Sequence, residues 1–115
     1  MKPIDPQAVQ RILDKLKNES LYLHLEMTTG AYASHFDSTK FTASTFLKNG
    51  LVRFTEGSIA GSGPAYRIGL KTDTGWVYSE GLTHWESDGN DTLLTAGYDS
   101  EGKLVVGLQL GKKTF

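Results

Sequence analysis

Short turns, rather than long connections, separate the strand-like runs of this chain, and this feature restricts its fold more than any other. Glycine accounts for 13 of the 115 residues, against about 7% in an average protein, and it falls between segments in which apolar and polar residues alternate. The clearest example is residues 61–83, GSGPAYRIGLKTDTGWVYSEGLT, which predict a Gly-Pro loop, a strand, a tight turn and a second strand. Strands joined by short turns pair antiparallel, because a parallel pair needs a crossover of about a dozen residues or more.

The N-terminal segment predicts the single helix of the chain. Asp5 can accept hydrogen bonds from the first backbone N–H groups of a helix, and Pro6 suits its first position. The apolar stripe at helical spacing consists of Val9, Ile12, Leu13 and Leu16. The Asn18-Glu19-Ser20 run ends the helix, which is expected to cover one face or one end of a sheet.

From Leu21 onward the hydrophobic period changes to two, which is typical of strands with one buried face. Strands are expected over residues 21–27, 31–36, 41–47, 51–59, 66–71, 76–80, 93–98 and 103–110. Residues 76–80 are expected to continue through a bend as far as Glu86. The inward side chains of the first run are predicted to be Leu21, Leu23, Leu25 and Met27, and those of the last run Leu104, Val106, Leu108 and Leu110.

The Asn49-Gly50 pair lies between two strand-like runs. Asn-Gly is favoured in two-residue type I′ hairpins, so residues 41–47 and 51–59 are expected to pair antiparallel. The predicted fold is therefore mainly β with one N-terminal helix, in a single domain over residues 1–115. An antiparallel meander of about eight strands would form a partly open barrel or a sandwich.

Composition excludes several classes of function. The chain has no cysteine, which excludes disulfides, thiolate metal ligands and cysteine nucleophiles. Lys and Arg number 12 against 13 Asp and Glu, and no basic face is visible, so no nucleic-acid partner is expected. No run approaches the ~20 apolar residues of a membrane span, and no apolar leader precedes the helix. We therefore expect a soluble cytoplasmic protein with no membrane partner, and no cofactor is predicted.

Two His-x-Glu pairs, His24 with Glu26 and His84 with Glu86, lie on predicted strands. Alternation places the two members of each pair on one face of its strand. If the two strands were adjacent, with His35 nearby, these side chains could bind a zinc-type ion or act in acid–base catalysis. A solvated sheet face explains the same pattern more simply, so no metal site is assigned.

A second candidate surface combines Arg67 with four aromatic residues on predicted strands: Tyr66, Trp76, Tyr78 and Trp85. Tyr, Trp and Arg are enriched at protein interfaces, so these side chains could line a groove for a ligand or a partner. Cross-strand packing is the alternative interpretation.

Three stretches of the chain carry a family resemblance: residues 22–32 (YLHLEMTTGAY), 63–83 (GPAYRIGLKTDTGWVYSEGLT) and 94–110 (LTAGYDSEGKLVVGLQL). Together they resemble the YojF family, small uncharacterised proteins of Bacillus-type bacteria. The resemblance implies no catalytic residue, because the family has no established activity. It does imply a context, since genes of this family tend to lie beside a gene for a zinc-dependent deacetylase of the type used in bacillithiol synthesis.

Two functional hypotheses follow. The leading one is a non-enzymatic accessory or interaction protein that binds the neighbouring deacetylase or a second copy of itself, because the central hairpin is rich in aromatic residues and no catalytic set is recognisable. A homodimer is expected because exposed sheet edges are often covered by a second copy. The alternative is a small-molecule-binding protein or an enzyme that uses the His-x-Glu pairs, with Arg67 as an anchor for anions.

Overall fold

The computed structural model describes residues 1–29, 43–89 and 91–115. Its helix is α1 (Pro6–Leu16), and its strands are β1 (Lys2–Pro3), β2 (Leu21–Thr29), β3 (Ala43–Val52), β4 (Glu56–Ala60), β5 (Tyr66–Lys71), β6 (Trp76–Leu82), β7 (His84–Glu86), β8 (Thr92–Tyr98) and β9 (Leu104–Gly111). The expected strand at residues 31–36, the start of the one at 41–47, and His35 lie outside the described residues.

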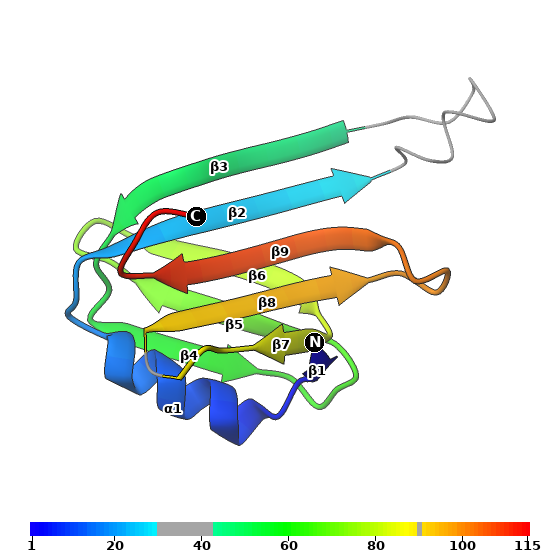
Figure 1. Cartoon of the computed structure of the whole chain (residues 1–115), viewed down its shortest axis with the longest axis horizontal. Coiled ribbons are helices and arrows are strands. Elements are labelled where there is room, and N and C mark those ends of the chain that lie inside the picture. The colour runs from blue at the N-terminus through cyan, green and yellow to red at the C-terminus, as the bar shows by residue number, and fades with distance from the viewer. Residues whose placement is uncertain (30–42, 90) are drawn as a thin grey trace.

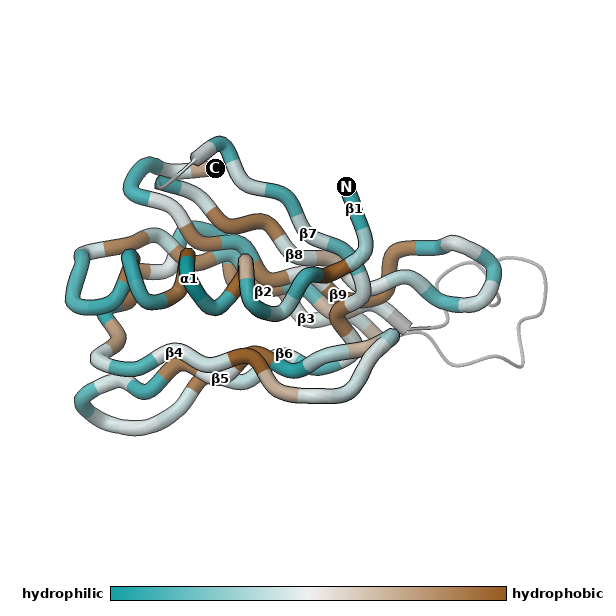
Figure 2. The backbone as a smooth tube through the Cα atoms, turned by 90° about the horizontal axis from the view of Figure 1, so that it is seen from below, coloured by the Kyte–Doolittle hydropathy of each residue, from teal (hydrophilic) through white to brown (hydrophobic). Residues whose placement is uncertain are grey.

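The strands form two separate sheets, which we call the large sheet and the small sheet (Figure 1). The large sheet has the order β1-β7-β8-β9-β2-β3 and the small sheet the order β4-β5-β6. Every strand pairing is antiparallel. In Figure 2 the small sheet faces the large sheet as the second layer of a sandwich. The mainly β, antiparallel sandwich with one helix is therefore confirmed, whereas the sheets do not close into a barrel.

The strands do not follow a simple meander, because β2 pairs with β9 as well as with β3. Core-facing residues of these strands lie opposite one another, with Leu23 across from Leu110 and the partly buried Leu25 across from Leu108. This pairing joins the first long strand of the chain to the last. A period of two in the sequence indicates which face of a strand is buried, but it carries no information about which strand is the neighbour.

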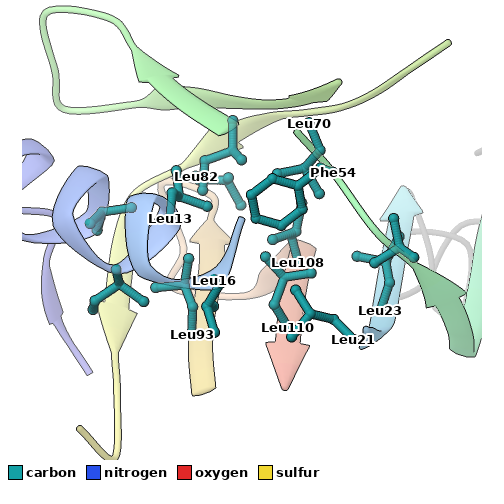
Figure 3. Packing of buried hydrophobic residues seen from close by; sticks show 14 of the residues in the cluster. Leu13, Leu16, Leu21, Leu23, Phe54, Leu70, Leu82, Leu93, Leu108 and Leu110 are labelled. Atoms are coloured by element: carbon teal, nitrogen blue, oxygen red, sulfur yellow. The ribbon is translucent and has the colours of Figure 1, made fainter. Parts of the chain in front are cut away.

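The hydrophobic core lies between the sheets and is closed at one side by α1 (Figure 3). The predicted stripe of the helix is confirmed, since its four residues Val9, Ile12, Leu13 and Leu16 are all buried. Phe54, in the segment that carries the chain from β3 to β4, is fully buried among leucines of both sheets. The predicted cap is also confirmed, because Asp5 Oδ1 accepts hydrogen bonds from the backbone N–H groups of Gln7 and Ala8 at 3.1 and 3.2 Å.

The prediction of a hairpin turn at Asn49-Gly50 is wrong. Both residues lie inside the continuous strand β3, where Leu23 pairs with Gly50 but Leu25 pairs with Leu47. This register shift is a β-bulge, in which one strand has an extra residue. Asn49 adopts a φ of 55° there, so the left-handed conformation that favours Asn in a hairpin turn is used within a strand.

The hairpin predicted for residues 61–83 is confirmed, with β5 and β6 joined at a turn where the Thr72 N–H donates to the Gly75 carbonyl at 2.8 Å. The expected continuation to Glu86 instead crosses between sheets, because β6 ends at Leu82 and β7 belongs to the large sheet. Gly81, with a φ of 84°, lies at this crossing. Its carbonyl approaches Gly97 so closely that a Cβ atom on Gly97 would clash with it.

Two of the expected inward side chains are exposed. Met27 and Leu104 are 50% and 43% exposed, whereas the other leucines of these two runs and Val106 are buried or partly buried. A register shift between β8 and β9 lies beside Leu104, so regular alternation does not reach that residue. Among the described residues, no helix is long and apolar enough to cross a membrane.

Candidate functional site

The outer face of the small sheet carries two large aromatic side chains that remain about half exposed. Trp76 and Tyr78 are 47% and 54% exposed, and both belong to β6. Their ring centroids are 5.5 Å apart with an angle of 9° between the planes, so the two rings are stacked. Because residues i and i+2 of a strand share a face, the sequence Trp-Val-Tyr places both rings outward while Val77 packs against the core.

Gly69 makes room for this stack. It lies directly across from Tyr78 in the pairing of β5 with β6. A Cβ atom on Gly69 would lie only 2.8 Å from Tyr78 Cε1, so the tyrosine ring lies over this position because glycine has no side chain.

Arg67 and Glu80 extend the row of planar groups beyond Tyr78. The guanidinium carbon of Arg67 lies 5.2 Å from the centroid of the Tyr78 ring, which is within cation–π range. Arg67 Nη1 also donates a hydrogen bond to Glu80 Oε1 at 3.1 Å. We call Trp76, Tyr78, Arg67 and Glu80 the aromatic ladder.

A shallow pocket of about 320 Å³ adjoins the charged end of the ladder. It is lined by Ala60, Gly61, Ala65, Tyr66, Arg67, Glu80 and Gly81. Small residues form most of this lining, and the Arg67–Glu80 pair supplies both donors and acceptors. The Tyr66 hydroxyl lies close to Gly63, where a Cβ atom would be 2.8 Å away. The loop before β5 therefore packs around Tyr66.

The pair His24 and Glu26 lies on a different surface, the outer face of the large sheet. His24 Nε2 and Glu26 Oε1 are 3.8 Å apart, and the two side chains are 17% and 22% exposed. Glu26 lies over Gly107 of β9, where a Cβ atom would be 3.2 Å from the Glu26 carboxylate. The pair becomes a salt bridge when the imidazole is protonated.

The pair His84 and Glu86 lies on β7, three strands away from β2 in the sheet order. His84 Nδ1 is hydrogen-bonded to Thr83 Oγ1 at 2.7 Å, and its ring meets the Tyr98 ring edge-on at 5.2 Å. Strand spacing puts β7 and β2 about 14 Å apart, too far for one metal ion with ligand bonds near 2 Å. Within the described ranges, no group of three or more His, Asp or Glu side chains could hold a metal ion.

Trp85 does not join the ladder. It belongs to the large sheet and packs against the hydrophobic core, with the Lys2 ammonium 4.7 Å from its ring centroid. Its indole Nε1 is buried without a hydrogen-bond partner in the described part of the chain.

Of the nine residues singled out from the sequence, the structure brings together Arg67, Trp76 and Tyr78 in the ladder, with Tyr66 lining the adjoining pocket. It also brings His24 to Glu26, on the other sheet. Glu80 was missed, although it continues the alternation of Trp76 and Tyr78 on β6 and could have been found from that period. Gly69 was also missed, and its position opposite Tyr78 depends on strand register rather than on local sequence.

Comparison with known proteins gives one consistent result. The chain matches the family described as "Protein of unknown function (DUF1806)" over residues 3–115. It is 41% identical over 115 residues to the uncharacterized protein YojF of Bacillus subtilis strain 168, covering 100% of this chain and 98% of that protein. The crystal structure of the Bacillus subtilis YojF protein is similar with a TM-score of 0.81 and 38% identity, covering 99% of this chain and 95% of that one. The resemblance to the YojF family is therefore confirmed.

Proposed function

Because the chain belongs to the DUF1806 family, described as proteins of unknown function, we propose a function from its surface: it is a cytoplasmic, non-enzymatic accessory protein whose aromatic ladder binds a partner protein. Two large stacked aromatic side chains are left half exposed on this face. Tyr, Trp and Arg are the residues that most often dominate the binding energy of an interface.

The ladder also has the properties of a pre-formed binding surface. Tyr78 contacts both Trp76 and Arg67, and Glu80 holds the guanidinium of Arg67. Side chains already ordered before binding lose less conformational entropy when a partner arrives. The adjoining pocket offers a concave site for one side chain of that partner.

The zinc-dependent deacetylase implied by the family resemblance is the partner we propose. Native mass spectrometry of the chain mixed with that enzyme should detect a mixed complex. The double variant Trp76→Ala/Tyr78→Ala should weaken the complex roughly several hundredfold, because each ring is expected to be a hot spot of about 2 kcal/mol.

Leu104→Ala is the matched control, since Leu104 is an apolar residue of similar exposure on the large sheet. It should leave the complex unchanged. A mixed complex that survives the double variant would rule out the ladder as the docking surface. If no complex forms with the wild-type chain, the deacetylase is not the partner.

The second candidate function is binding or turnover of a small molecule at the outer face of the large sheet. The observation that favours it is the 3.8 Å contact between His24 and Glu26, two residue types that serve in acid–base catalysis. A small molecule that co-purifies with the chain and is lost in His24→Ala would support this function. Retention of the same molecule by His24→Ala would contradict it.

A further inference from the structure

We propose that the outer edge of β3, which has no neighbouring strand among the described residues, pairs with β3 of a second copy of this chain. The two strands would run antiparallel about a two-fold axis at Phe46. This inference does not depend on the aromatic ladder, which lies on the other sheet. The proposed dimer would join two large sheets into one continuous sheet.

Two of the sheet edges are protected against such pairing. The edge strand β1 has two residues, and one of them is Pro3, which has no N–H to donate. At the edge strand β4, the side chain of Gln10 hydrogen-bonds to backbone groups that would otherwise be open to an added strand. Gln10 Nε2 donates to the Gly57 carbonyl at 2.8 Å, and its Oε1 accepts from the Ile59 N–H at 3.1 Å.

The edge of β3 has no comparable protection within the described residues. Among the described residues, β3 is the last strand of the large sheet and the longest strand of either sheet, with 10 residues and no proline (Figure 1). Long, unguarded edges are the ones on which strand pairing between chains occurs.

Apolar side chains are exposed on both faces of β3. This observation favours an added β-strand, rather than a partner that packs on one face, as the group that covers this edge. Phe46 lies on the outer face beside Glu26 and is 60% exposed. Leu47 lies on the inner face beside Leu25 and is 44% exposed. A partner that covered only one face would leave the other side chain in water, whereas an added strand contacts both faces at once.

A second copy fits this edge in one favourable register. With Phe46 opposite its own symmetry mate, Thr45 lies opposite Leu47 and Ser44 opposite Lys48 of the second copy. Residues opposite one another then share a face, as a continuous sheet requires. Each Lys48 meets a serine rather than the other Lys48, which avoids the repulsion of like charges placed directly opposite.

The β-bulge limits the paired segment. The register shift near Asn49 bends β3 away from regular pairing, so the symmetric ladder would span residues 43–49. Such a short ladder gives a weak dimer, whose population depends on protein concentration.

The absence of cysteine allows a clean crosslinking test. The Phe46→Cys variant should form a covalent dimer under mild oxidation or with a short bis-maleimide, because residues directly opposite have Cβ atoms about 5 Å apart. Leu51→Cys is the matched control, since Leu51 is an exposed apolar residue of the same strand. In the proposed register the two Leu51 positions lie about 30 Å apart or more, so this variant should stay monomeric.

Sedimentation or light scattering from about 1 µM to about 500 µM gives a measurement without crosslinking, over the range in which a short interface should assemble. Wild-type chain should dimerise within this range, and Phe46→Lys should weaken the dimer at least about tenfold by placing two charges together at the axis. A monomer at every concentration would overturn the proposal. So would crosslinking of Leu51→Cys in place of Phe46→Cys, and crosslinking of Trp76→Cys alone would place self-association on the ladder instead.

Discussion

The two outer faces of this sandwich are built on similar antiparallel strands but present different chemistry. On the small sheet, Trp76 and Tyr78 are stacked and about half exposed, beside an arginine and a glutamate. On the large sheet, His24 and Glu26 contact each other and lie mostly covered among neighbouring strands. The small sheet therefore presents exposed aromatic rings, which is why we propose it as the partner surface, whereas the His24–Glu26 pair on the large sheet is largely covered.

Substitutions at three glycines would test this comparison. An added Cβ atom would meet backbone at Gly97, a packed aromatic ring at Gly69 and a flexible carboxylate side chain at Gly107. The largest loss of stability is expected at Gly97, between the sheets, where an added Cβ would clash with the Gly81 carbonyl. Backbone cannot move aside as a surface side chain can, so Gly97→Ala should lower the free energy of unfolding by about 3 kcal/mol. Urea denaturation would measure the loss, and a midpoint equal to that of the wild type would contradict the close approach of β6 to β8.

The next largest effect is expected at Gly69, beneath the ladder. Gly69→Val fills the space over which Tyr78 lies and should displace its ring from Trp76 and Arg67. The lost stacking and cation–π contacts should cost about 1–2 kcal/mol. Tryptophan fluorescence should report the change around Trp76, and partner binding should fall as in the double alanine variant. Unchanged fluorescence together with unchanged binding would show that the stack does not depend on Gly69.

Arg67→Ala removes the guanidinium from Tyr78 and from Glu80. Both contacts are solvent-exposed, with Arg67 51% and Glu80 68% exposed at the side chain, so the expected loss is about 1 kcal/mol or less. Arg67→Lys keeps the charge but loses the planar group, and it separates the stacking contribution from the ion pair. Thermal denaturation at low and high salt would distinguish them, because salt screens the ion pair.

The smallest effect is expected at Gly107 on the large sheet. Gly107→Ala places a Cβ atom 3.2 Å from the flexible end of Glu26, which can rotate into solvent. The free energy of unfolding should change by about 0.5 kcal/mol or less, measured by urea denaturation beside Gly69→Val. A loss as large as that at Gly69 would mean that the two outer faces are equally constrained.

Much of the candidate site could be predicted from local sequence. Trp76, Tyr78 and the unrecognised Glu80 alternate on one short strand, and such alternation fixes their common face. The contribution of Arg67 could not be derived in the same way, because its contact with Tyr78 depends on the pairing of β5 with β6 and on the bulge between them. The separation of the two His-x-Glu pairs likewise depends on the strand order, in which β8 and β9 come between them.

The sequence by itself determined the local conformations: the capped helix with its apolar stripe, the hairpin of β5 and β6, and the left-handed residue Asn49. These depend on backbone preferences and on the spacing of apolar residues within a few positions of each other. Only the tertiary structure decided that Asn49 serves a bulge rather than a hairpin, that β2 lies beside β9, and that the chain leaves one sheet for the other at Gly81. The physical reason is that strand neighbours are selected by burial of the whole core, which sums contacts between residues far apart in the chain.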